Sequence, residues 1–184
     1  MSEKMILRNS RPENIDERLE KEVMCYDFLD KLNIEYCLVD HDEAKDMDAC
    51  VKIEDVLGAP ICKNLLLTNR QQTEFYLLLM PGDKPFKTKE LSKQIDSARL
   101  SFASSEQMEK YLNVTPGSVS IMGLMFDKEK KVQLIVDEDI KKNEYFGCHP
   151  CINTSTLRIK TTDVFDTLTD ALEHKYMVVN LIGE

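Results

Sequence analysis

The sequence has no apolar run approaching the ~18 residues that a membrane-spanning helix needs, so we expect neither a membrane span nor a membrane partner. Its first five residues, Met1-Ser2-Glu3-Lys4-Met5, lack the layout of a secretory signal peptide. Six cysteines in 184 residues are too few for a disulfide scaffold. We therefore expect a cytoplasmic protein whose thiols are reduced.

Internal repeats, low-complexity tracts and linkers are also missing, and 184 residues suit one compact domain. A chain of this size buries roughly 70% of the surface that it exposes when unfolded, which is enough for a core without disulfides or metals. We therefore predict a single domain over residues 1–184.

The net charge of −9 argues at first against a nucleic-acid partner, and DNA is not expected. The charge is unevenly distributed, however. Residues 1–60 contain 8 Lys and Arg against 16 Asp and Glu, whereas the remaining residues contain 16 against 17. Five basic residues lie close together in the second part: Lys84, Lys87, Lys89, Lys93 and Arg99. They form either a basic face for phosphate groups or an ordinary solvated helix surface.

Periodicity and capping residues predict a mixed α/β (α+β) fold. Helices are expected at residues 16–32, 46–57, 89–96, 105–112 and 163–174. Strands are expected at residues 34–39, 62–69, 74–80, 121–126, 131–137, 156–160 and 176–181, with a further short strand at 100–102. Polar turns between neighbouring strands predict hairpins, and hence a mixed, largely antiparallel sheet flanked by helices.

The segment Gly147-Cys148-His149-Pro150-Cys151-Ile152-Asn153-Thr154 gathers the most reactive groups in the sequence. The spacing of Cys148 and Cys151 is used by zinc sites and by redox dithiols. A structural zinc site usually needs a second cysteine pair, and the sequence has none. A redox dithiol normally opens a helix, whereas this segment leads into a predicted strand. A binding loop built around His149 is the third interpretation, and it needs no metal.

Two other segments carry groups that suit a polar site. Lys63 and Asn64 begin a strongly apolar predicted strand, where a lysine either stays solvated or stabilises negative charge. Gly117 and Ser118 lie in an irregular segment of small residues, which is either a plain turn or a place where a ligand approaches the backbone. These residues alone do not name a reaction.

Taken together, four segments resemble motifs of the YbaK/ProX superfamily of aminoacyl-tRNA editing proteins, in the order of that family. They are Lys63-Asn64-Leu65, residues 100–104, residues 116–120 and the Gly-x-His-Pro-x-x-Asn-Thr signature at 147–154. The resemblance implies that Lys63 and His149 are catalytic. It also implies a substrate-binding set formed by Asn64, Gly117, Ser118, Gly147, Asn153 and Thr154, with no required metal or cofactor.

Within the superfamily the chain looks most like the free-standing prolyl-tRNA editing proteins, which hydrolyse Ala-tRNA(Pro). This resemblance implies two partners, the acceptor end of mischarged tRNA(Pro) and, transiently, prolyl-tRNA synthetase. Where the family commonly has Ser-Pro-Phe-Gly-Leu, this chain has Ser120-Ile121-Met122-Gly123-Leu124. Deacylation of a seryl or cysteinyl ester therefore stays open as an alternative. A non-catalytic module that binds tRNA or a synthetase is a separate alternative.

Overall fold

A computed structural model describes residues 4–184. Residues 1–3, on which the signal-peptide prediction partly depends, lie outside the described residues. In the described part nine strands form two sheets, with the orders β1-β2-β8-β7 and β5-β3-β4-β6-β9. Their bounds are Leu7–Arg8 (β1), Tyr36–Asp40 (β2), Cys62–Asn69 (β3), Phe75–Pro81 (β4), Leu100–Phe102 (β5), Val132–Asp137 (β6), Tyr145–Cys148 (β7), Ser155–Lys160 (β8) and Tyr176–Val179 (β9).

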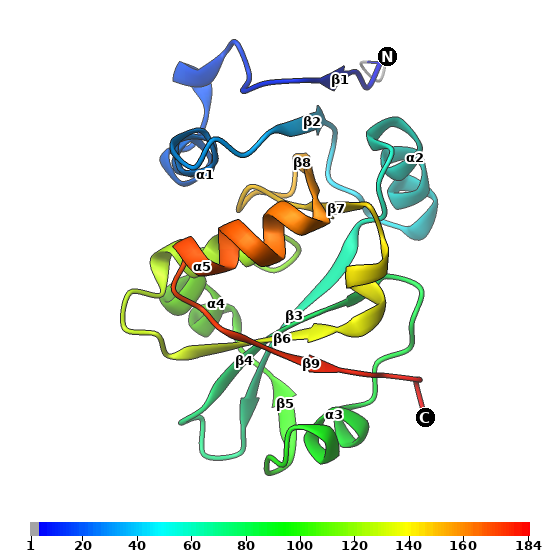
Figure 1. The fold of residues 1–184 in the computed structure, drawn as a ribbon, viewed down its shortest axis with the longest axis vertical. Coiled ribbons are helices and arrows are strands. Elements are labelled where there is room, and N and C mark those ends of the chain that lie inside the picture. The colour runs from blue at the N-terminus through cyan, green and yellow to red at the C-terminus, as the bar shows by residue number, and fades with distance from the viewer. Residues whose placement is uncertain (1–3) are drawn as a thin grey trace.

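The helical segments cover the sheets. They are a 3-10 turn at Ile15–Glu17, α1 (Glu20–Lys31), α2 (Met47–Leu57), α3 (Thr88–Gln94), α4 (Ser105–Leu112), 3-10 turns at Ile121–Phe126 and Glu138–Lys142, a π turn at Asp163–Leu168 and α5 (Thr169–Ala171). Figure 1 shows α5 and the turns before it between the two sheets, with α3 on the other side of the five-stranded sheet. No helix in residues 4–184 has both the length and the apolar character needed to span a bilayer.

The five-stranded sheet is buried on both faces. Along β4, Leu77 and Leu79 face the main core, which includes the segment that ends in α5. Leu78 and Met80 face a second core that is closed by Leu91 of α3. Successive side chains of a strand point to opposite faces, and both faces are covered. This is why β4 has a continuous apolar sequence instead of an alternating one.

Strand pairing confirms the predicted mixed, largely antiparallel fold and adds a parallel component. β3 and β4 form the predicted antiparallel hairpin. β4 pairs with β6, and β6 with β9, in parallel. Parallel neighbours require a crossover connection, and α3, β5 and α4 supply the one between β4 and β6.

Local capping chemistry places two helices where the sequence predicts them. The Asp46 side chain accepts a hydrogen bond of 2.8 Å from the amide of Ala49 at the start of α2, and Gly58 ends that helix with φ of 74°. Ser104 and Gln107 form a reciprocal capping box at the start of α4. Both helices therefore begin at residues whose side chains satisfy free backbone amides.

The predicted strand over residues 121–126 is wrong, because this segment is a 3-10 helix. Ser120 caps it by accepting a hydrogen bond of 3.1 Å from the amide of Met122. Gly123 lies so close to Leu112 of α4 that an added Cβ would be 2.8 Å from the Leu112 carbonyl oxygen. The predicted hairpin with β6 is consequently absent from the described part of the chain.

Other differences concern helix geometry and short strands. The segment predicted as a helix over 163–174 begins as a π turn and ends at Ala171. The strands β1 and β7 were not predicted. β7 matters for the site, because its Gly147 forms a parallel bridge to Ile61 and so joins the two sheets.

Candidate active site

His149 lies directly after β7 and is held by the chain that follows it. Its Nδ1 lies 2.8 Å from the backbone carbonyl oxygen of Ser155, the first residue of β8. A carbonyl oxygen can only accept a hydrogen bond, so Nδ1 carries the proton. In the neutral ring Nε2 is then the acceptor nitrogen. The loop between β7 and β8 therefore presents an imidazole of defined tautomer.

The surroundings of His149 favour its neutral form. Burial of the ring lowers the pKa of His149, and the nearby His41 lowers it further. The hydrogen bond to Ser155 opposes these effects without cancelling them. The ring is therefore neutral at neutral pH and can accept a proton or a hydrogen bond through Nε2.

His41 is the residue at this site that the sequence interpretation missed. It follows β2, and its ring centroid lies 6.2 Å from that of His149. Its Nε2 is 2.8 Å from Oγ1 of Thr156, which in turn lies 3.4 Å from Nδ1 of His149. A single histidine among acidic residues offers no motif, so only the pairing of β2 with β8 reveals this contact.

Lys63 and Asn64 lie on β3, close to the join between the sheets. Ile61 and Gly147 form a parallel bridge, and Lys63 and His149 each follow their bridge residue by two positions, so both segments leave the same join between the sheets. The Lys63 ammonium donates a hydrogen bond of 2.8 Å to the carbonyl of Lys84.

Asn64 leaves one acceptor unused. Its amide nitrogen donates a hydrogen bond of 2.9 Å to the carbonyl of Cys62. Its side-chain oxygen is buried and has no hydrogen-bond partner among the described residues. A buried acceptor without a partner costs free energy, on the order of 1–3 kcal/mol. Such an atom is therefore suited to receive a donor from a ligand.

The predicted glycine loop lies beside the signature loop. Gly117 has φ of 90°, and a Cβ there would be 3.7 Å from the side-chain nitrogen of Asn153. Asn153 and Thr154 also line a hollow of about 500 Å³, together with Thr115 and the start of α1. The structure thus brings together three of the predicted binding residues, Gly117, Asn153 and Thr154.

Ser118 and Gly147 serve the protein's own backbone and do not offer free amides. The Ser118 hydroxyl closes a turn with the amide and carbonyl of Thr115, and its own amide donates to the same carbonyl. The Gly147 amide donates to the carbonyl of Pro60 over 3.1 Å. These two residues shape the loops, and the predicted part of Ser118 and Gly147 in substrate binding stays a prediction.

Gly147 permits the close approach of the two sheets, which gives a stability prediction. A Cβ at this position would be 2.7 Å from the Pro60 carbonyl oxygen, a backbone atom that cannot turn away. Gly147→Ala is therefore expected to lower the free energy of unfolding by about 1–3 kcal/mol, the usual cost of overpacking. Urea denaturation measures this change. An unchanged midpoint would contradict the close-approach role.

The thiols of the signature loop are buried. Burial raises the pKa of Cys148 to about 12, so its thiolate is scarce at neutral pH. The Cys151 sulfur lies 3.7 Å from the sulfur of Cys25. In residues 4–184 no three His, Cys, Asp or Glu side chains are grouped as metal ligands. The geometry therefore favours the interpretation centred on His149 over the redox dithiol.

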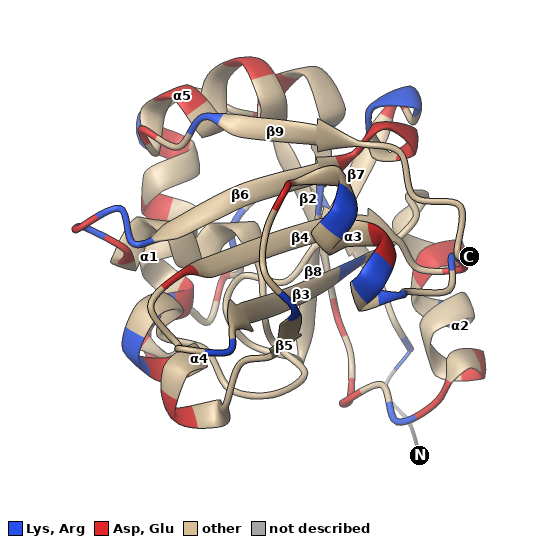
Figure 2. Ribbon diagram, turned by 90° about the horizontal axis from the view of Figure 1, so that it is seen from below, with Lys and Arg blue, Asp and Glu red and all other residues tan. Residues whose placement is uncertain are grey.

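The five residues of the predicted basic face have different surroundings. Lys84 is occupied by Asp137 at 2.8 Å and by Asp139 at 2.9 Å, and the carboxylate of Asp137 is fully buried. The Lys84 ammonium is therefore held in structural ion pairs and is not available as a free cation for phosphate. The other four members are exposed on or near α3: Lys87, Lys89, Lys93 and Arg99. Figure 2 shows Lys and Arg positions on α3.

Comparison with known proteins identifies the class to which this site belongs. A sequence model of the aminoacyl-tRNA editing domain matches residues 41–167. The chain is 32% identical over 136 residues to the prolyl-tRNA editing protein ProX of Acetoanaerobium sticklandii, covering 74% of this chain and 83% of that protein. The chain therefore belongs to the aminoacyl-tRNA editing domain family.

A second curated protein and a solved structure are also similar to this chain. The prolyl-tRNA synthetase associated domain-containing protein 1 of Danio rerio is 27% identical over 140 residues, covering 75% of this chain and 76% of that protein. A crystal structure described as a candidate trans-editing enzyme for prolyl-tRNA synthetase has a TM-score of 0.64 at 12% identity. It covers 89% of this chain and 99% of that chain, and at this identity it supports the fold alone.

Proposed function

We propose that this protein hydrolyses the ester of mischarged Ala-tRNA(Pro) and releases alanine and tRNA. The observation that carries the proposal is a neutral His149 whose Nδ1–H is fixed by the Ser155 carbonyl, which leaves Nε2 as the acceptor nitrogen. The membership of the chain in the editing domain family supports the same substrate class. In this proposal the protein acts in the cytoplasm, where it binds tRNA and, transiently, prolyl-tRNA synthetase.

The chemistry needs a positioned water and stabilisation of developing negative charge. Water attacks the ester carbonyl carbon, the bond to the terminal ribose oxygen breaks, and a proton moves to that oxygen. Nε2 of His149 accepts a hydrogen bond from the water or from the ribose 2′-hydroxyl. The Lys63 ammonium stabilises the oxyanion electrostatically, and neither residue forms a covalent intermediate.

Asn64 provides a place for the amino group of the aminoacyl ester. Its buried side-chain oxygen has no partner among the described residues, and an α-ammonium group is a strong donor. A charge-assisted hydrogen bond to this oxygen would fix the position of the amino group of the ester at β3. Gly117, Asn153 and Thr154, which lie together beside the signature loop, are assigned to a separate part of the substrate-binding surface in this proposal.

Selection for alanine over proline rests on size. A methylene group in a pocket contributes only about 1–3 kcal/mol of discrimination, so exclusion of the larger ring is more effective than differential attraction. The segment that departs from the family pattern, residues 121–126, is a 3-10 helix whose Ile121, Met122 and Leu124 are buried. Its rigid packing suits a pocket of fixed size.

A panel of charged tRNAs tests which ester is removed. We expect Ala-tRNA(Pro) to lose its amino acid far faster than in buffer, and Pro-tRNA(Pro) to remain intact. Faster loss from a seryl or cysteinyl ester than from the alanyl ester would replace the proposed substrate with one of the two alternatives. Tight tRNA binding without ester loss would favour the non-catalytic module.

The exposed basic residues of the α3 region are proposed to contact tRNA phosphates, because Lys63 touches Lys84 and so lies beside this region. Replacing Lys87, Lys89 and Lys93 together by alanine is expected to weaken tRNA binding about tenfold at moderate salt and to lower the salt dependence by about one unit per lost phosphate contact. Filter binding at several salt concentrations measures both quantities.

A matched control for this experiment removes the same number of positive charges from another part of the surface. Lys31, Lys128 and Lys160 are also exposed but lie outside the α3 region. Their triple alanine variant should bind tRNA nearly as well as the parent protein. Equal losses in the two triple variants would mean that general charge, and not the α3 surface, attracts the RNA.

A further inference from the structure

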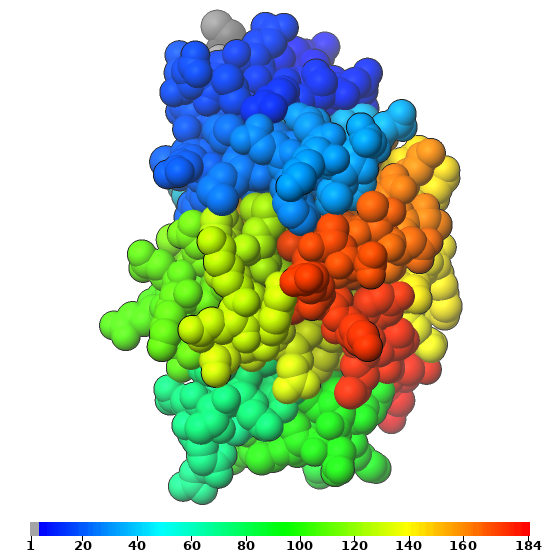
Figure 3. Space-filling model, turned by 60° about the vertical axis from the view of Figure 1, so that its left-hand side comes forward, coloured from blue at the N-terminus to red at the C-terminus, as the bar shows by residue number. Residues whose placement is uncertain are grey.

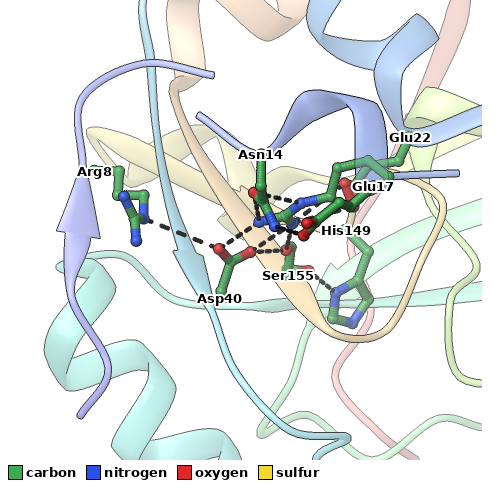
Figure 4. A network of polar contacts seen from close by, with 8 residues as sticks. Arg8, Asn14, Glu17, Glu22, Asp40, His149 and Ser155 are labelled. Atoms are coloured by element: carbon green, nitrogen blue, oxygen red, sulfur yellow. Dashed lines mark hydrogen bonds and ion pairs between the residues drawn. The ribbon is translucent and has the colours of Figure 1, made fainter. Parts of the chain in front are cut away.

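A line of charged and polar groups leads from the N-terminal segment to His149. Arg18 donates two hydrogen bonds to the carboxylate of Asp40, at 2.8 Å and 2.7 Å. The Ser155 hydroxyl also donates a hydrogen bond to the same carboxylate. The carbonyl of Ser155 accepts the proton on Nδ1 of His149. Figure 4 shows Asp40, Ser155 and His149 in this line.

Strand register and helix spacing bring these groups together. Asp40 ends β2 and lies directly opposite Ser155, which begins β8. Arg18 precedes α1 and also contacts Glu22, four residues later, at 3.3 Å. The Arg18 side chain is only 14% exposed, and Glu22 is buried. The line is therefore a built, largely desolvated network and not a surface ion pair.

The carboxylate at the centre of this network is ionised. Burial alone would raise the pKa of Asp40, but hydrogen bonds from Arg18 and Ser155 outweigh it and hold that pKa below its ordinary value. A bidentate pair of arginine and carboxylate fixes the position of both groups. The Ser155 hydroxyl is consequently held in one orientation, and its residue is anchored at the point where the signature loop enters β8.

The residues that start this line lie outside the matched editing domain. That match begins at residue 41, whereas Arg18 and Asp40 precede it. Figure 3 shows the N-terminal residues gathered at one end of the molecule. This end is also the most acidic part of the sequence, and Arg18 is one of its few basic residues.

We propose that Arg18 and Asp40, acting through Ser155, are positioning residues that hold the site histidine in its Nδ1–H tautomer and keep its Nε2 free. The N-terminal segment thereby completes the active site. The catalytic consequence rests on the proposed function, whereas the effect on the imidazole does not. A histidine whose second nitrogen is fixed by a hydrogen bond has a defined tautomer and orientation.

The test uses the full chain with two variants, Ser155→Ala and Asp40→Ala. Nitrogen NMR of His149 reports which ring nitrogen carries the proton, and single-turnover hydrolysis of Ala-tRNA(Pro) reports the rate. Arg11→Ala is the matched control. Arg11, like Arg18, precedes α1, but it makes ion pairs with Asp27 and Asp30 of α1 and does not contact His149. It should leave the tautomer and the rate unchanged.

Ser155→Ala keeps the backbone carbonyl but loses the hydroxyl that ties this residue to Asp40, so we expect the carbonyl to lose its fixed position and the single Nδ1–H tautomer to become a mixture. The catalytic rate should fall by about 10- to 100-fold with little change in KM, as follows when an orienting contact is lost. Should Ser155→Ala fail to fold, Asp40→Ala gives the same two readouts, because that side chain is one-third exposed. A folded variant that keeps the Nδ1–H tautomer overturns the proposal, whatever its rate.

The two proposals fail in different ways. If the parent protein does not hydrolyse Ala-tRNA(Pro) but the variants change the His149 tautomer, the proposed function is wrong and the positioning role stands. If the parent protein is active and both variants retain its rate and tautomer, the proposed function stands and the positioning role is wrong.

Discussion

Lys63→Ala is expected to lower the rate of alanyl-ester hydrolysis by about 100- to 1,000-fold, the loss that follows removal of one charge-stabilising group from an active site. The Lys63 ammonium is the proposed electrostatic partner of the oxyanion, which exists only in the transition state. The effect should therefore fall on the catalytic rate more than on KM. Single-turnover hydrolysis of Ala-tRNA(Pro) measures it.

Stability should change little in the same variant. The Lys63 side chain makes one hydrogen bond, to the carbonyl of Lys84, and is only partly buried. Loss of such a bond costs about 1 kcal/mol. Lys175→Ala, at an exposed position beyond α5, is the matched control and should keep full activity. Full activity in folded Lys63→Ala would remove this residue from the site.

His149→Ala is expected to lower the rate by about 100- to 10,000-fold, the range for loss of a positioned acid–base group. The pH dependence of the parent protein's rate should also show a fall at acid pH that is missing in the variant. The pKa of His149 is lowered from 6.5, so the ring is neutral above that pH. Protonation at lower pH turns Nε2 into a donor, and the rate should fall as pH falls through the lowered pKa.

The pH profile distinguishes this role from a structural one. Hydroxide-driven loss of the ester, measured with His149→Ala, is subtracted at each pH. The nearby His41 lowers the pKa of His149, so His41→Asn should move the acid limb to higher pH. An acid limb above pH 6.5, or no acid limb at any pH at which the protein stays folded, would contradict a neutral His149 with a lowered pKa as the acceptor.

Local chemistry explains which elements could be predicted from the sequence. Asp46 with Gly58, and Ser104 with Gln107, mark helix ends through contacts that span only a few residues. The run at 121–126 carried no such information, because a short buried apolar segment suits a strand as well as a helical turn. Its helical form depends on contact with α4, which is a tertiary feature.

The candidate site likewise has some features that are visible in the sequence and others that depend on the tertiary structure. The motifs around Lys63 and His149 are visible in the sequence, and their resemblance to one family identifies them. Their proximity depends on the bridge between Ile61 and Gly147, which joins residues far apart in the chain. His41 belongs to no motif, and its contact follows from the pairing of β2 with β8.

Roles within the predicted site were also beyond the sequence. A glycine in a signature suggests a free amide near the ligand, yet the Gly147 amide is used by Pro60. A lysine in a basic run suggests phosphate contact, yet Lys84 is held by Asp137. In both cases the partner is distant in sequence and buried. Sequence patterns therefore identify candidate residues, whereas the bonds that each group makes follow from the tertiary structure.

The most direct test of the account is turnover of excess Ala-tRNA(Pro) by a small amount of protein at neutral pH. We predict that all of the alanyl ester is lost, at a rate proportional to protein, while Pro-tRNA(Pro) remains charged. The rate should fall sharply in His149→Ala. Ester loss that stops at one equivalent of protein, or does not exceed that in buffer, would contradict an editing hydrolase built around His149 and Lys63.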